Sequence, residues 1–522
     1  MLALALVVAL LIAIGVGSVV APRLGLPAPV LLVGLGSLLS LVPGLTGVRL
    51  PPEAVLLIFL PVLLYWESLT TSLREIRRLL RGIILNGTLL VGVTAAAIAV
   101  VLHALGVSWG AAWIIGAALG PTDATVVAAL GHGLPRRTSV VLQAESLIND
   151  GTALVIYALA IGTATGQIDP TPANAAGRLA LSFVGGIAVG LVTGWLLFRV
   201  RRALHEPALV NLNSLLTPLL AYLLAEEIHA SGVLAVVVAG LYMSQVTPGA
   251  IAAPARQQGA AFWTFSTFIL NGALFVLVGI QLPHSAGELT TDTAGHALVL
   301  VAAAYLTMLV ARYGFLNLSI AVIRLVDRRP YQRTLRTTHR ARVVSTVAGF
   351  RGAVSLAVAL AVPGSLSDRG LIVFVTGTFV VVSLVLQGVA LPRVIRWARL
   401  PDDSSVVEEL RTARVAATRE ALEALPELGQ AAGAADEVME RLTEEYEEKL
   451  AALQESEGDE AQAATRMEQR RGLTLELIAR KRATIVRLRD EHTIDDTVLR
   501  EIQSQLDAEE VRLLGSSSSE GS

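Results

Sequence analysis

Two short segments place charged and polar side chains inside apolar runs. Residues 145–152 read Glu-Ser-Leu-Ile-Asn-Asp-Gly-Thr, which sets two carboxylates and an asparagine in an otherwise apolar stretch. Gly120-Pro121-Thr122-Asp123 adds a third carboxylate beside a helix breaker in the preceding apolar run. An ionisable side chain at membrane depth is costly and is usually retained for a function. The two segments therefore indicate a path for cations.

Helical spacing groups the polar side chains of the later segment. Ser146 and Asp150 are four residues apart and share one face, whereas Glu145 and Asn149 form a second stacked pair about 100° away. Hard cations such as sodium favour oxygen ligands, so Ser146 and Asp150 offer a hydroxyl and a carboxylate at a compatible spacing. The alternative for Asp150 alone is a carboxylate bonded within a helix bundle.

Pro121 predicts a broken helix in the earlier segment. A proline inside a span removes one backbone hydrogen bond and obstructs another, and the freed carbonyls are tolerated only where they line a cavity. Thr122 and Asp123 lie at this break and can add ligands to the site. Asp123 alone could be a helix cap, but carboxylates in two neighbouring spans favour a shared site.

A second interruption lies near the other end of the apolar region, at Gly349-Phe350-Arg351-Gly352. Two interrupted spans in the two halves of a chain are typical of inverted-repeat transporters, whose site lies midway through the membrane. Arg351 would then face Asp123 or Asp150. Its permanent charge could stand in for a second cation or balance the carboxylates.

Arg312 is a further arginine inside an apolar run, in Met308-Leu309-Val310-Ala311-Arg312-Tyr313. A charge at this depth requires a buried partner, and Glu145 is the best candidate. The alternative is that the side chain extends to the membrane interface.

The elements that would position these residues are membrane-spanning helices. The chain has 522 residues, 53% of them hydrophobic, and a mean hydropathy of +0.63, which predicts an all-α polytopic membrane protein. Runs of about 17–25 apolar residues suit the bilayer core. Thirteen such spans are predicted near residues 1–20, 28–47, 54–71, 82–105, 110–130, 138–164, 177–198, 208–228, 231–245, 260–281, 296–324, 343–363 and 370–392. The absence of cysteine excludes disulfides and thiolate sites.

Arginine-rich loops predict the orientation, because positive charge favours the cytoplasmic side. With thirteen spans, these loops all fall on one side: Arg74–Arg81, Arg136–Arg137, Arg199–Arg202, Arg324–Arg342 and Arg393–Arg399. The amino terminus is therefore expected outside and the carboxyl tail in the cytoplasm. The first span has no charged n-region and is expected to be a retained helix rather than a signal peptide.

The chain divides by charge near residue 400. Residues 1–400 carry 26 basic and 14 acidic side chains, whereas residues 401–522 carry 15 basic and 29 acidic ones. The first part is the predicted transmembrane domain, and the second is a predicted cytoplasmic helical tail. Pro426 and the Gly429–Gly433 region are expected to divide the tail, and Ser516–Ser522 is expected to be disordered. The tail as a whole is either a solvated appendage or a segment that senses or binds a partner.

Residues 1–400 resemble the sodium/proton antiporters of the cation/proton antiporter class, which includes bacterial exchangers and the animal sodium/hydrogen exchangers. The resemblance rests on Gly120–Asp123, Glu145–Asp150 and Phe350–Leu356. It implies that Asp150, with Asn149, forms the family's Asn-Asp pair and that its carboxylate is shared by cation and proton. The other implied roles are those of Thr122 and Asp123 at the first broken helix, Ser146 as a coordinating serine, Glu145 with Arg312 as a structural ion pair, and Arg351 at the second broken helix. Thirteen helices, a homodimer formed by a scaffold domain and electroneutral, elevator-like exchange are also implied.

The third span departs from the pattern of many relatives, which place an acid directly after the aromatic residue. Here Leu60-Pro61-Val62-Leu63-Leu64-Tyr65 is followed by Trp66, and Glu67 comes one place late. A shift of one residue turns a side chain by about 100°, which would direct Glu67 away from the site. Whether Glu67 is a ligand therefore stays open, and so does the choice of ion.

These features predict an antiporter of the cytoplasmic membrane in which Asp150 binds either a proton or a monovalent cation, sodium first, and carries each across in alternation. Burial disfavours the charged form of Asp150 and Arg351 favours it, so the two effects can balance near the working pH. No cofactor is expected beyond the transported ion and proton, and no nucleic-acid partner. A proton-coupled solute symporter and a potassium/proton exchanger of the same family are the alternatives.

Two other classes are disfavoured. A channel would need polar rings along a continuous pore, whereas the carboxylates here are isolated at breaks. An enzyme would need a nucleophile and base or a metal site, but the eight histidines are scattered and none has metal-ligand spacing.

Overall fold

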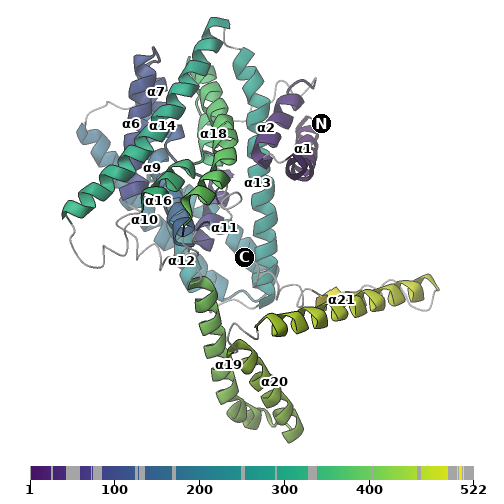
Figure 1. Ribbon diagram of the computed structural model, residues 1–522. Helices are drawn as coiled ribbons and strands as arrows, with labels where there is room; N and C mark the ends of the chain where they lie inside the picture. Colours follow the sequence, from purple (N-terminus) through teal and green to yellow (C-terminus); the bar gives the residue numbers. More distant parts are fainter. Residues whose placement is uncertain are drawn as a thin grey trace. The chain divides into compact units, whose positions relative to one another are not determined.

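The structure is a computed structural model in which every regular element of the described part is a helix (Figure 1). It describes residues 2–24, 27–42, 59–71, 73, 85–123, 127, 134, 136–166, 172–247, 253–287, 291–326, 338–400, 405–454, 460–491, 502–503, 505–507 and 509–510. The chain forms two compact units, Met1–Asp402 and Asp403–Ser522.

The first unit contains the apolar helices. In chain order they are α1 (Leu2–Leu24), α2 (Ala28–Leu39), α4 (Leu60–Thr70), the π-helical turn η2 (Leu85–Leu90), α6 (Val91–Ala104), α7 (Trp109–Leu119), α9 (Arg136–Ala164), α10 (Pro172–Arg202), α11 (Pro207–Glu227), α12 (Gly232–Val246), α13 (Ala253–Gly287), α14 (Thr291–Val326), α16 (His339–Val347), α17 (Ala353–Leu360) and α18 (Arg369–Ala398). Within the described residues, eight helices are long and apolar enough to cross a membrane, and α2, α7 and α12 are shorter apolar helices.

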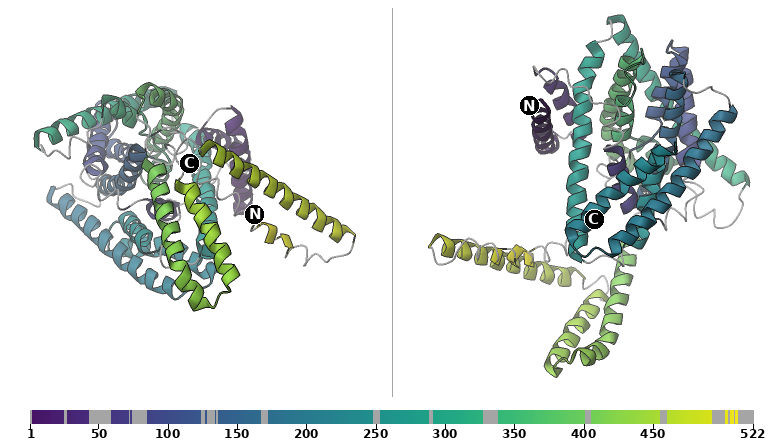
Figure 2. Two further views of the ribbon diagram at one scale, coloured as in Figure 1. Left: turned by 60° about the horizontal axis from the view of Figure 1, so that its bottom comes forward. Right: turned by 180° about the vertical axis from the view of Figure 1, so that it is seen from behind.

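The helices pack around two buried apolar clusters. One lies among α6, α7, α9, α14, α17 and α18 and includes Ile114, Tyr157 and Phe379. The other joins α1, α2, α4, α11, α12 and α13 to the remaining side of α16 to α18 and includes Tyr65 and Trp263. Figures 1 and 2 show α13 beside α1 and α2, with α6 and α7 across the unit.

Backbone contact joins α2 to α13. A Cβ atom added at Gly36 would overlap the carbonyl oxygen of Val276, and one added at Gly279 would overlap that of Val33. Ser37 Oγ also donates to the carbonyl of Gly279 at 3.1 Å. Only glycine permits this approach, so the rotation of α13 relative to α2 is fixed.

Two non-helical segments meet inside the unit. Helix α7 ends at Leu119, and the described residues that follow, up to Asp123, are not helical. Residues 349–352 separate α16 from α17 in the same way. The backbone N–H of Asp123 donates to the carbonyl of Phe350 at 2.8 Å, so the two segments lie in direct contact.

The second unit contains α19 (Ser405–Ala432), α20 (Asp436–Gln454) and α21 (Glu460–Asp490). Helices α19 and α20 pack together around a turn at Gly433, whose φ of 64° suits glycine. On α21, Arg482 pairs with Asp507 and Glu510. The expected break at Pro426 is wrong, because Pro426 lies inside α19 and, in a solvated helix, water can bond the carbonyl that a proline frees. Ser516–Ser522 lies outside the described residues.

Candidate functional site

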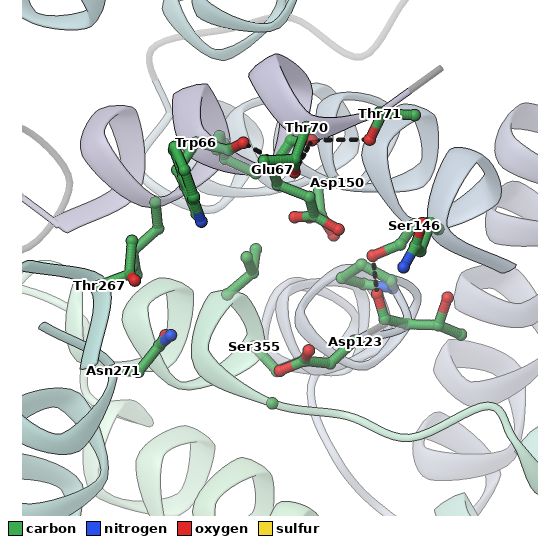
Figure 3. A pocket seen from close by; sticks show the side chains of 17 residues that line it. Trp66, Glu67, Thr70, Thr71, Asp123, Ser146, Asp150, Thr267, Asn271 and Ser355 are labelled. Carbon is green, nitrogen blue, oxygen red and sulfur yellow. Dashed lines mark hydrogen bonds between the residues drawn. The ribbon is translucent and has the colours of Figure 1, made fainter. Parts of the chain in front are cut away.

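A cavity of about 340 Å³ lies where the two non-helical segments meet α4, α9 and α13 (Figure 3). Its polar side chains come from α4, α9, α13, α17 and the segment after α7. Glu67, Thr70 and Thr71 come from α4 and its end, Thr122 and Asp123 from the segment after α7, Gln143, Ser146 and Asp150 from α9, Thr267 and Asn271 from α13, and Ser355 from α17. The cavity therefore contains three carboxylates, those of Glu67, Asp123 and Asp150.

Helix α9 holds the segment after α7 by two side-chain hydrogen bonds. Ser146 Oγ donates to the carbonyl of Thr122 at 2.7 Å. Asn149 Nδ2 donates to Thr122 Oγ1, also at 2.7 Å. Ser146 lines the cavity, whereas the amide of Asn149 is used to position Thr122. The two stacked pairs predicted from helical spacing, Ser146 with Asp150 and Glu145 with Asn149, therefore make different contacts.

Asp150 lies on the cavity side of α9 and is 2% exposed. Its Oδ1 has no hydrogen-bond partner among the described residues. The charges of Glu67 and Asp123 both act on it, and Figure 3 shows its carboxylate directed into the cavity. Three negative charges this close repel each other in a medium of low dielectric constant. A proton or a bound cation must relieve that repulsion.

Glu67 lines the cavity despite its one-residue shift. Leu63, Glu67 and Thr70 follow one another at helical spacing, and all three face the cavity from α4. Glu67 Oε1 is buried without a hydrogen-bond partner in the described part of the chain. The shift would have turned Glu67 away from the cavity if α4 had the rotation that suits the acidic position of the relatives. Helix α4 instead presents the face that carries Glu67.

Asp123 packs against the second non-helical segment. A Cβ atom added at Gly352 would overlap the carboxylate oxygen Oδ2 of Asp123. The absence of a side chain at Gly352 therefore makes room for this carboxylate beside the cavity.

Arg351 is buried and 1% exposed, and its guanidinium donates to backbone carbonyls. Nε bonds Leu119 O at 2.7 Å and Nη2 bonds Gly120 O at 3.3 Å, while Nη1 bonds Gly349 O. The last carbonyls of a helix lack intrahelical partners and carry partial negative charge. The sequence placed Arg351 opposite Asp123 or Asp150, but these hydrogen bonds direct it to the end of α7.

Glu145 and Arg312 lie in contact beside this segment. Oε1 of Glu145 is 2.7 Å from Nη1 of Arg312, and Arg312 Nε donates to the carbonyl of Ser345 at 3.0 Å. The charges of both residues act on Arg351. The fold therefore groups two arginines, Arg312 and Arg351, with one glutamate, Glu145.

The sequence analysis did not predict that α13 lines the cavity. Asn271 interrupts the apolar run Phe268-Ile269-Leu270-Asn271-Gly272-Ala273-Leu274-Phe275. An amide inside an apolar span is the signal that would have found it. No three His, Cys, Asp or Glu side chains in the described ranges are grouped closely enough to hold a metal ion.

Comparisons with known proteins show what the chain is similar to. The family described as "Sodium/hydrogen exchanger, transmembrane" matches residues 6–397. A protein of Mycobacterium tuberculosis named as an uncharacterized Na⁺/H⁺ exchanger is 42% identical over 521 residues, covering 98% of this chain and 96% of that protein. A sodium, potassium, lithium and rubidium/H⁺ antiporter of Bacillus subtilis is 30% identical over 395 residues, covering 70% of this chain and 57% of that protein.

A solved structure has a similar fold. The structure of the sodium proton antiporter MjNhaP1 from Methanocaldococcus jannaschii at pH 8 matches with a TM-score of 0.60 and 18% identity, and the match covers 77% of this chain and 100% of that one. At this identity the likeness concerns the fold alone. It confirms the all-helical, multi-span membrane fold predicted from the sequence.

Proposed function

The chain belongs to the sodium/hydrogen exchanger family, and on that premise we propose that it exchanges sodium for protons across the cytoplasmic membrane at a site centred on Asp150. The family consists of membrane transporters and not of enzymes. At the coarser level the protein is a monovalent cation/proton antiporter.

The observation that carries the proposal is the convergence of Glu67, Asp123 and Asp150 on one buried cavity. Like charges in a site of low dielectric constant cannot all stay ionised without a counter-charge. A sodium ion or a proton can supply that charge, and each makes binding of the other less favourable. Mutually exclusive occupancy of Asp150 turns alternating access into exchange, because the carrier crosses loaded with one ion or the other.

The ligand set follows from the cavity lining. Asp150 and Asp123 supply carboxylate oxygens, Ser146 a hydroxyl and Thr122 a backbone carbonyl, with Glu67 as a further carboxylate. Asn149 positions Thr122 through its amide. Glu145 and Arg312 act as a structural pair, and Arg351 balances charge by holding the end of α7.

Alternating access requires one group of helices to move against another. The cavity lining comes from two groups of helices: α9, α17 and the segment after α7 belong to one group, and α4 packs with α13 in the other. This division supports movement of a core formed by α6, α7, α9, α14 and α16 to α18 against a scaffold formed by the remaining helices of the first unit. Thirteen spans, an inverted repeat with two broken helices and a homodimer formed by the scaffold complete the proposed architecture.

The proposed topology puts the amino terminus outside and the tail in the cytoplasm, in accordance with the arginine-rich loops. Residues 1–400 form the transport domain and residues 401–522 the cytoplasmic tail. The change in charge near residue 400 supports this division.

Potassium/proton exchange is the second candidate. A Bacillus subtilis relative is named for transport of sodium, potassium, lithium and rubidium against protons. An exchanger of the same family can thus accept several alkali ions, and oxygen ligands alone do not exclude the larger ones.

Dissipation of a preset pH gradient in proteoliposomes tests the proposal. The purified protein is reconstituted with an acidic lumen, and sodium, lithium, potassium or rubidium is added outside in turn. Sodium should collapse the gradient at the lowest concentration, without a change in membrane potential. Equal or better use of potassium would favour the second candidate, and no collapse with any alkali ion would overturn cation/proton exchange.

A further inference from the structure

Helix α13 presents one polar stripe to the cavity. Trp263, Thr267 and Asn271 follow one another at spacings of four residues and so share a face of the helix. Trp263 is buried and stacks on Trp66 of α4, with ring centroids 5.8 Å apart and planes 8° from parallel. This contact fixes the rotation of α13 beside Glu67, and Thr267 and Asn271 then line the cavity over the next two turns (Figure 3).

Asn271 is half-buried at the cavity and makes no hydrogen bond to the described residues, and it interrupts the apolar run from Phe268 to Phe275. The side-chain oxygen of an amide that lines a cavity can accept a hydrogen bond or coordinate an ion there. Thr267 uses its hydroxyl proton to bond the carbonyl of Trp263 at 2.8 Å. Its oxygen lone pairs remain available as acceptors.

The elements that line the cavity differ in the charge that they contribute. Helices α4 and α9 and the segment after α7 contribute carboxylates, whereas α13 contributes a neutral amide and a neutral hydroxyl. Carboxylates attract protons and cations alike, because both carry positive charge. Neutral oxygens coordinate a cation but do not take up a proton near neutral pH. A neutral wall therefore distinguishes the two competing ions.

We propose that Asn271, supported by Thr267, coordinates the transported cation through its side-chain oxygen and sets the affinity and selectivity of the site for alkali ions. The inference rests on the proposed function, because it concerns the same cavity. It assigns cation ligands to α13 as well as to α9, so a bound sodium ion would bridge the two helices. Binding of a proton to Asp150 would require no ligand from α13.

The test measures exchange in proteoliposomes as a function of cation concentration for wild type, Asn271→Ala, Asn271→Ser, Thr267→Val and Ser266→Ala. Ser266 is a matched control, since it is a polar residue of α13 about 140° around the helix from Asn271 and does not line the cavity. Thermal unfolding of each detergent-solubilised variant, with and without sodium chloride against choline chloride, measures cation binding independently of reconstitution.

We expect Asn271→Ala to raise the KM for sodium about threefold to tenfold, the range for loss of one neutral polar contact, with a maximal rate close to that of wild type. The ratio of KM values for sodium, lithium and potassium should change as well. Asn271→Ser should recover part of the affinity, Thr267→Val should have a smaller effect, and Ser266→Ala should match wild type. The sodium-dependent rise in Tm should shrink in Asn271→Ala alone among the alanine variants.

An Asn271→Ala protein with the KM and ion preference of wild type would overturn the inference while leaving the proposed function intact. The same holds for a variant whose maximal rate falls equally for all ions, since that pattern indicates a structural role. An inactive wild-type protein would instead overturn the proposed function. If Asn271→Ala fails to fold, Asn271→Ser and Thr267→Val give the same comparison of KM with maximal rate.

Discussion

Glu145 and Arg312 form an ion pair between α9 and α14, 167 positions apart in the chain, with Oε1 2.7 Å from Nη1 and both side chains 3% exposed. The pair extends to α16 because Arg312 Nε also donates to the carbonyl of Ser345. Three helices around the second non-helical segment are thereby joined. The contact is what the sequence led us to expect for two charges at membrane depth.

Removal of either partner should destabilise the protein. Glu145→Ala and Arg312→Ala each leave an uncompensated buried charge, which typically costs about 3–5 kcal/mol. Replacing both residues with apolar side chains of similar volume should cost much less. A double-mutant cycle on Tm in detergent isolates the coupling.

The exposed pair of Glu445 and Lys449 on α20 is the matched control, since exposed pairs of this kind contribute little. Its removal should leave Tm unchanged. Additive losses at Glu145 and Arg312 would show that the buried contact does not stabilise the fold.

Local chemistry was predictable from the sequence, whereas packing between distant helices was not. The spacing of Ser146 and Asp150 predicts a shared face, and Pro121 predicts an interruption, because both depend only on neighbouring residues. Two of the three carbonyls that accept from Arg351 are more than 200 positions away, which no local pattern reveals. The rotation of α4 that brings Glu67 to the cavity depends likewise on its neighbours, and so does the wall formed by α13.

Asp150→Asn should abolish exchange without unfolding the protein. The substitution preserves the size of the side chain but removes the charge for which proton and cation compete. Exchange in proteoliposomes should fall to the level of protein-free vesicles, while yield and elution volume in gel filtration stay those of wild type. Exchange at the wild-type rate would contradict competition at Asp150.

Asp123→Asn should strongly impair exchange. It removes one of the three negative charges in the cavity and one carboxylate ligand, so the affinity for a cation should fall. The KM for sodium should rise by at least about tenfold, the loss expected when a contact to a charged group worth about 1.5–3 kcal/mol is removed. An unchanged KM would show that Asp123 is not a ligand.

A chain that ends at Asp403 should still exchange cations for protons. The tail is a separate compact unit of solvated, acidic helices, and none of its described residues lines the transport cavity. Its loss should leave the maximal rate within about twofold, with a shifted pH profile if the tail has a regulatory role. A truncated protein that inserts normally but is inert would make the tail part of the transport machinery.

Gly352→Ala should displace Asp123 and so impair exchange without any change in the charged residues. An alanine Cβ at this position would overlap the carboxylate of Asp123 and lie 2.8 Å from its Cβ atom, so the side chain of Asp123 or the segment around it must move. Overpacking of this kind typically costs about 1–3 kcal/mol, and a displaced ligand should raise the KM for sodium.

Gly151→Ala is the matched control: Gly151 follows Asp150 on α9, and a Cβ atom added there has no other atom within 4 Å. Because alanine favours helix over glycine by about 1 kcal/mol, that variant should be at least as stable as wild type and equally active. Sodium-dependent exchange and Tm are measured on both variants. A Gly352→Ala protein with the sodium KM of wild type would show that the position of the Asp123 carboxylate does not matter for transport.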